Sequence, residues 1–164
     1  MTEIASEAEL EALYDAPVPT SILKEVDHIT DDYRKLIEAS PFAILATSGP
    51  EGLDPRVALL FLIPGIGTTM RVNGRARLTA DPELCASFAM EGKNPKCVIV
   101  IAVERAYTQC QKAIVRSKLW EPAMHVAKSE LPTVGEMMER LSKGDFDGKA
   151  YDVEYPERMK RTIY

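Results

Sequence analysis

The chain has 164 residues, which suits one domain, and its 46% apolar and 27% charged content is ordinary for a globular protein. Its net charge of −5 argues against nucleic-acid binding by overall electrostatics. No run approaches the roughly 18 apolar residues of a membrane-spanning helix, and the acidic start lacks the blocks of a signal peptide. We therefore expect a cytoplasmic protein that binds neither nucleic acid nor a membrane.

Helix and strand signals alternate along the first half of the chain. Residues 1–19 are acidic and end in a Pro-Val-Pro turn, which predicts an arm ahead of a single domain over residues 20–164. Thr20 or Ser21 is expected to cap a short helix, and Thr30 a second one, because hydroxyl oxygens accept from free N–H groups at helix starts. Apolar or alternating runs between turn residues predict strands over 42–47, 57–63, 68–79 and 97–103.

The second half of the chain carries stronger helix signals. The pair Asp81-Pro82 predicts a helix start, and Gly92 is expected to end that helix. A further helix should follow the last strand and end at Trp120-Glu121-Pro122. The capping box Thr133-Val134-Gly135-Glu136 then opens the last amphipathic helix, within a C-terminal helical tail of about residues 121–164.

The third predicted strand alternates basic or polar residues with small or apolar ones. Successive side chains of a strand point to opposite faces, so one face should carry Arg71, Asn73, Arg75 and Arg77. A solvated sheet face is the simpler interpretation of this pattern. The alternative is an anion site, because a guanidinium group can pair with two phosphate oxygens at once.

A second basic group follows the last strand. Lys112 and Arg116 are one helical turn apart and share a side, with Trp120 one turn further. A cationic outer helix face with the tryptophan packed against the sheet would explain this spacing. The alternative is a cradle for a phosphorylated ring cofactor, in which the cations hold the phosphate beside a flat aromatic ring.

Three motifs, in this order, carry a resemblance to a known family: Phe61-Leu62-Ile63-Pro64-Gly65, Arg71-Val72-Asn73-Gly74-Arg75-Ala76 and Cys110-x-Lys112-Ala113-x-x-Arg116-Ser117-x-Leu119-Trp120. They resemble the pyridoxamine 5'-phosphate oxidase-like flavoproteins, in particular the bacterial pyridoxamine 5'-phosphate oxidase-related, FMN-binding subgroup. The resemblance covers most of residues 20–164. It implies a mainly β, α+β fold: an antiparallel split β-barrel with flanking helices, in a homodimer that holds FMN between its subunits.

The resemblance also implies which residues bind the cofactor. These are Thr69, Arg71, Gln109, Lys112, Arg116, Ser117 and Trp120. Thr69 would face the isoalloxazine ring, and Arg71, Lys112 or Arg116 could stabilise the anionic reduced flavin. Relatives often have a histidine where this chain has Gln109, which can hydrogen-bond a flavin edge but cannot exchange a proton near neutral pH.

No catalytic residue is assigned from the sequence. His28 and His125 are isolated, and no metal site or catalytic triad can be assembled from the spacing. The three cysteines, Cys85, Cys97 and Cys110, have neither metal-ligand spacing nor an even number, so we expect small buried hydrophobic side chains at these positions.

The function that follows from the resemblance is FMN binding, with a flavin-dependent oxidoreductase of unknown substrate as the first interpretation. The alternative is a non-catalytic flavin-binding or cofactor-free dimer of the same fold. A third interpretation is that the anion site takes another phosphorylated ligand, such as a nucleotide. The C-terminal substrate-phosphate signature of the true oxidases is not visible, so oxidation of pyridoxamine phosphate is not predicted.

One departure from the family pattern follows Asp54. Relatives usually continue there with a Ser-Pro-Arg-Gly-Asp stretch, a strand pair and a helix start, whereas Asp54 runs directly into Pro55-Arg56-Val57. Either the chain has lost this segment or the printed sequence omits it. A closed barrel of six strands would need two more than the four predicted. Without them strand edges would be exposed, and a partner subunit would be expected to cover them.

Overall fold

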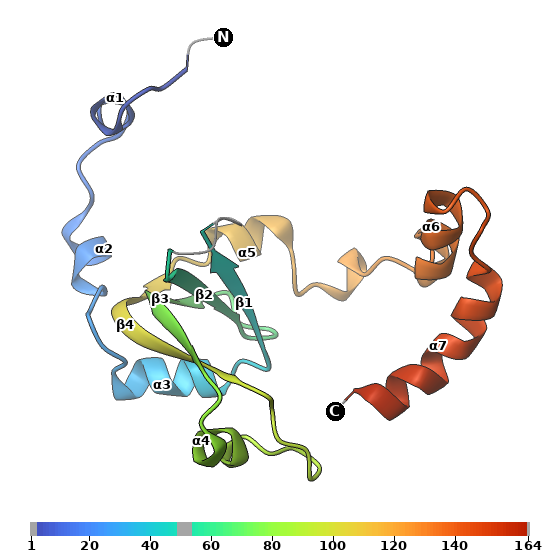
Figure 1. The fold of residues 1–164 in the computed structure, drawn as a ribbon. Helices are drawn as coiled ribbons and strands as arrows, with labels where there is room; N and C mark the ends of the chain where they lie inside the picture. The colour runs from blue at the N-terminus through green and yellow to red at the C-terminus, as the bar shows by residue number, and fades with distance from the viewer. Residues whose placement is uncertain (1–2, 49–53, 164) are drawn as a thin grey trace. The chain divides into compact units, whose positions relative to one another are not determined.

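The computed structural model describes residues 3–48 and 54–163 of the chain. Four antiparallel strands form one sheet in the order β1-β2-β3-β4, and helices flank it, which confirms the predicted α+β class (Figure 1). The sheet is open in this part of the chain, with β1 and β4 at its edges. The strands are β1 (Phe42–Thr47), β2 (Arg56–Leu62), β3 (Thr69–Thr79) and β4 (Val98–Gln109).

Helices lie before, between and after the strands. They are α1 (Glu7–Glu11), α2 (Pro19–Leu23), α3 (Asp31–Glu38), α4 (Pro82–Ser87), α5 (Lys112–Ser117), α6 (Val134–Leu141) and α7 (Gly148–Thr162), with short 3-10 turns at Pro122–Met124 and Lys128–Glu130. Among the described residues, none of these helices has the length and apolar content to cross a membrane.

The chain divides into two compact units. The first consists of Met1–Arg77 with Val100–Ser117 and holds most of the sheet, and the second consists of Leu78–Ile99 with Lys118–Tyr164. The boundaries of the predicted arm (1–19) and domain (20–164) stay a prediction.

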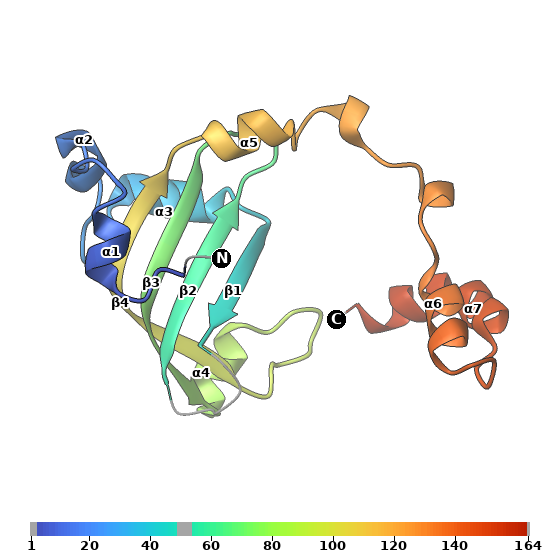
Figure 2. The same ribbon diagram turned by 90° about the horizontal axis from the view of Figure 1, so that it is seen from above.

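One face of the sheet is covered by α3 and carries the core of the first unit (Figure 2). The register sets Leu59 opposite Val72 and Phe61 opposite Met70, so these side chains share that face. Buried Met70 and Val72 form a cluster with Ala106, and Tyr33, Leu36 and Ile37 of α3 pack against it. α3 begins where predicted, because the Thr30 hydroxyl accepts from the Tyr33 N–H at 3.2 Å.

The other face of the sheet carries the predicted basic side chains, and we call it the arginine face. Arg75 lies opposite Arg56, Asn73 opposite Ala58, and Arg71 opposite Leu60, which confirms that the three β3 residues share one face. The register between β1 and β2 adds the apolar side chains Phe42, Ile44 and Ala46 to the same face.

Several local predictions need correction. α2 begins at Pro19 after Val18, without a side-chain cap, so the cap predicted at Thr20 or Ser21 is wrong: proline already occupies the first turn. α4 ends at Ser87, and Gly92 instead occupies a later turn with φ +77°. Of the cysteines only Cys85 is buried, because Cys97 and Cys110 lie outside the packed strands and helices.

The helix after the last strand is also shorter than predicted. α5 ends at Ser117, and Lys118 follows with φ 52°, a left-handed conformation that stops the helix. Trp120 is therefore not one turn beyond Arg116 on the same helix face, and that prediction is wrong. Trp120 belongs to the second unit, whereas α5 belongs to the first.

The second unit contains a helical hairpin of α6 and α7. The predicted capping box is confirmed: the Thr133 hydroxyl accepts from the Glu136 N–H at 3.1 Å, and the Thr133 N–H donates to the Glu136 carboxylate at 3.1 Å. Asp152 of α7 joins the hairpin, since it accepts from the Gly135 N–H at 3.0 Å and from the Thr133 hydroxyl. The start of α6 is thus fixed by its own cap and by its neighbour.

Candidate functional site

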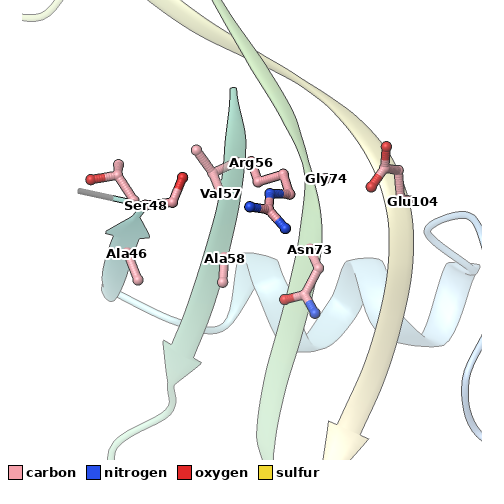
Figure 3. Close-up of a pocket in the computed structure, with 9 residues that line it drawn as sticks. Ala46, Ser48, Arg56, Val57, Ala58, Asn73, Gly74 and Glu104 are labelled. Atoms are coloured by element: carbon pink, nitrogen blue, oxygen red, sulfur yellow. The ribbon is translucent and has the colours of Figure 1, made fainter. Parts of the chain in front are cut away.

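A hollow of about 440 Å³ opens where the arginine face meets the ends of β1 and β2 (Figure 3). Its size is in the range of small-molecule sites, although it is open to solvent. All four strands contribute to it, and its polar lining consists of Thr47, Ser48, Arg56, Asn73 and Glu104. Amide, hydroxyl, guanidinium and carboxylate groups therefore meet at one place on the sheet.

Arg56 is held in this hollow by Asp54. The Arg56 Nε donates to Asp54 Oδ2 at 2.7 Å and the Arg56 backbone N–H donates to Asp54 Oδ1 at 2.9 Å. The hydrogen bonds from the Arg56 side chain, and then from its backbone, hold the pKa of Asp54 well below its ordinary value of 3.8. The same pairing raises the pKa of Arg56. Arg56 therefore enters the hollow with its charge largely compensated.

We expect the substitution Arg56→Gln to raise the pKa of Asp54 toward 3.8, as measured by carboxyl ¹³C NMR titration. The pKa of Asp54 is lower in the folded protein than in the unfolded chain. Its contribution to stability is therefore present above pH 3.8 and is lost as the pH falls through the pKa of the folded state. Arg34→Gln, on exposed α3 surface, is the matched control and should leave this titration unchanged. A wild-type Asp54 that titrates near 3.8 would contradict the pairing.

Two polar atoms on the arginine face are buried without a partner. They are the Arg71 Nε donor and the Asn73 Oδ1 acceptor. An unpaired buried polar atom costs about 1–3 kcal/mol, so most such atoms in folded proteins have a partner. Neighbouring Arg75 is exposed and adds a second guanidinium group to this face. The face therefore offers hydrogen-bonding capacity that the described residues leave unused.

A second hollow, of about 300 Å³, lies against α5. It is lined by Gln111, Lys112, Val115 and Arg116, so the two cations share one side of the helix, as their spacing predicts. Gln111 packs on the turn before β3, where a Cβ added to Gly67 would lie 2.8 Å from the Gln111 Cβ. This places the second hollow at the end of the β2–β3 hairpin remote from Arg56. Arg56 and the two cations of α5 therefore line two separate hollows.

Three more of the predicted cofactor residues line neither of these two hollows. Thr69 is buried at the start of β3, on the same face as Arg71 by strand alternation. Gln109 is half-buried at the last position of β4. The Ser117 hydroxyl donates to the Ile114 carbonyl at 3.0 Å, so its proton is used within α5.

Of the residues that line the larger hollow, sequence reasoning predicted only Asn73, as part of the candidate anion site. The pairing of Asp54 with Arg56 could have been predicted, since residues two apart in an extended segment point to the same side and can pair. The place of Glu104 in the hollow could not have been predicted, because it depends on the pairing of β4 with β3 in the sheet. Thr47 and Ser48 enter it because β1 ends beside the start of β2.

Within residues 3–48 and 54–163, no group of three or more histidine, cysteine, aspartate or glutamate side chains is arranged to hold a metal ion. No family model, curated protein or solved structure matches the chain.

Proposed function

We propose that this protein binds FMN through its arginine face and acts as a flavin-dependent oxidoreductase. The observation that carries the proposal is the pair of buried, unpartnered atoms, Arg71 Nε and Asn73 Oδ1. A phosphate group accepts from guanidinium donors, and a flavin ring offers an N–H donor for an amide oxygen. The same residues belong to the motifs that resemble FMN-binding proteins, so the chemistry and the resemblance point to one ligand.

The proposed site is shared by two subunits. Arg71 and Arg75 would supply one cationic group from the arginine face, and Lys112 and Arg116 the other from the hollow against α5, which neither arginine lines. We therefore place FMN between the subunits of a homodimer, with a split β-barrel as the fold. Thr69, Gln109, Ser117 and Trp120 complete the proposed contact set.

The flavin would supply the redox chemistry, while the chain's own residues bind and orient it. Cationic side chains such as Arg71 and Lys112 would stabilise negative charge on the ring when it is reduced. The substrate is a small molecule of unknown identity. A cofactor-free dimer is the second candidate, and it is favoured because Arg71 and Arg75 do not line the hollow of Lys112 and Arg116.

FMN titration of the purified protein tests the proposal. We expect the visible flavin band to shift on binding, and Arg71→Gln to weaken FMN binding by about 10- to 100-fold, since a hydrogen bond to a charged group contributes about 1.5–3 kcal/mol. The control Arg34→Gln removes the same charge from exposed α3 surface and should bind normally. Bleaching of the bound flavin by a reduced nicotinamide would show redox competence.

Two outcomes would contradict the proposal. A colourless wild-type protein that takes up no added FMN would favour the cofactor-free dimer. Equal FMN affinity in the wild-type protein and in Arg71→Gln would show that the arginine face does not hold the cofactor.

A further inference from the structure

The β1 edge of the sheet lacks the features that protect most edge strands. β1 pairs with β2 on one side and has no partner strand on the other among the described residues. Its first five residues, Phe42–Ala46, are all apolar, and all six of its residues are exposed. Natural edge strands usually carry charges, prolines or bulges, whereas a continuous apolar run is typical of a strand covered on both faces. β1 thus has the sequence of a central strand in an edge position.

The opposite edge of the sheet is protected. β4 carries Glu104 and Arg105, and Arg105 pairs with Glu25 at 3.4 Å. The backbone of Val26 also exchanges two hydrogen bonds with Ala106 of β4, at 3.0 and 2.7 Å. Charge and a paired segment are two of the devices that keep an edge strand from joining another chain. The unprotected edge is therefore β1.

We propose that β1 pairs antiparallel with β1 of a second copy, which joins the two four-stranded sheets into one. The outward backbone N–H and C=O groups of a strand complement those of another strand, so β1 can complement itself. Residues 40–48 carry no charge, so two copies can approach at this edge without repulsion.

Symmetry favours β1 of the second copy over its β4 as the partner. A contact of β1 with itself is isologous and closes at two subunits, whereas β1 against β4 of the next copy would be head-to-tail and would extend into filaments. The β4 edge would also set the charged Glu104 and Arg105 beside an apolar strand. We therefore commit to the second copy's β1 as the occupant.

The two-fold axis also restricts the register of the proposed interface. An axis that relates two antiparallel edge strands runs perpendicular to the sheet, so residues opposite each other come from the same face of each copy. The register that sets Ile44 opposite Ile44 of the partner subunit pairs the whole apolar run with itself, with Phe42 opposite Ala46 of the partner subunit. Both arginine faces then lie on one side of the joined sheet.

Sedimentation of the full chain tests this interface. We expect a wild-type dimer, and we expect Ile44→Lys to raise its dissociation constant by about 100-fold or more, because two ammonium groups would meet at the axis. Ile22→Lys is the matched control: Ile22 is 61% exposed on α2 and Ile44 is 43% exposed on β1. An equimolar mixture of Ile44→Lys and Ile44→Glu should restore the dimer, because opposite charges then face each other.

Hydrogen exchange of the wild-type protein gives a readout that needs no variant. The amides of β1 should exchange more slowly as protein concentration rises. Three results would overturn the proposal: a wild-type monomer at all concentrations, a dimer unaffected by Ile44→Lys, or failure of the mixture to associate. Growth into larger oligomers would also overturn it and would favour the β1–β4 contact. The inference shares only the homodimer with the proposed function, since FMN titration reports on the cofactor and sedimentation on the interface.

Discussion

Gly74→Ala should lower the free energy of unfolding by about 3 kcal/mol, at the upper end of overpacking costs. A Cβ at this position would lie 2.1 Å from the Ala102 carbonyl oxygen and 3.0 Å from its carbonyl carbon. These are backbone atoms of the neighbouring strand, so no rotamer change can relieve the contact. β3 and β4 would have to separate at the point where Asn73 and Glu104 reach the larger hollow.

Urea unfolding followed by circular dichroism measures this effect. Gly92→Ala is an informative control, because a Cβ there meets open space while the glycine has φ +77°. That variant should lose only the roughly 1–2 kcal/mol of a left-handed alanine. Equal losses at the two positions would show that β4 can move away from residue 74 at little cost, since Gly74 itself has no positive φ.

Gly135→Ala should release the α6–α7 hairpin of the second unit. Its Cβ would lie 2.1 Å from the Gly148 carbonyl oxygen and 2.6 Å from Asp152 Oδ2, so it would disrupt both the helix crossing and the Asp152 cap. We expect a loss of about 3 kcal/mol in the stability of this unit. An isolated helix as short as the eight-residue α6 is not stable in water, so α6 should melt once α7 separates from it.

Hydrogen exchange resolved by peptide separates this local effect from global unfolding. Amides of α6 and α7 should lose protection, while those of β2 and β3 keep theirs, because the two units are separate compact bodies. Gly144→Ala serves as the control: a Cβ there has no neighbouring atom within 4 Å, so this variant should lose only the roughly 1–2 kcal/mol of an alanine at the positive φ of +94° and should keep the helix crossing. Retained protection of α6 in Gly135→Ala would mean that the crossing can widen without loss of the hairpin.

Local patterns predicted much of the fold. The four strands were placed within a few residues of their observed starts, because alternation and apolar runs report directly on strand faces. The caps at Thr30, Asp81 and Thr133 were predicted correctly, since each depends on a hydroxyl or carboxylate only three residues from the N–H that it accepts from. Errors fell at helix ends: Lys118 and Gly92 adopt left-handed conformations that residue type alone does not fix.

The candidate site was predicted only in its separate parts. The shared face of Arg71, Asn73 and Arg75 and the shared side of Lys112 and Arg116 follow from strand and helix geometry, which the sequence by itself determines. Only the tertiary structure decided that Asn73 lines one hollow while Lys112 and Arg116 line another, and that β1 is left as an exposed edge. The reason is physical: strand register and packing join residues far apart in the chain, and their contacts depend on the whole sheet and not on local spacing.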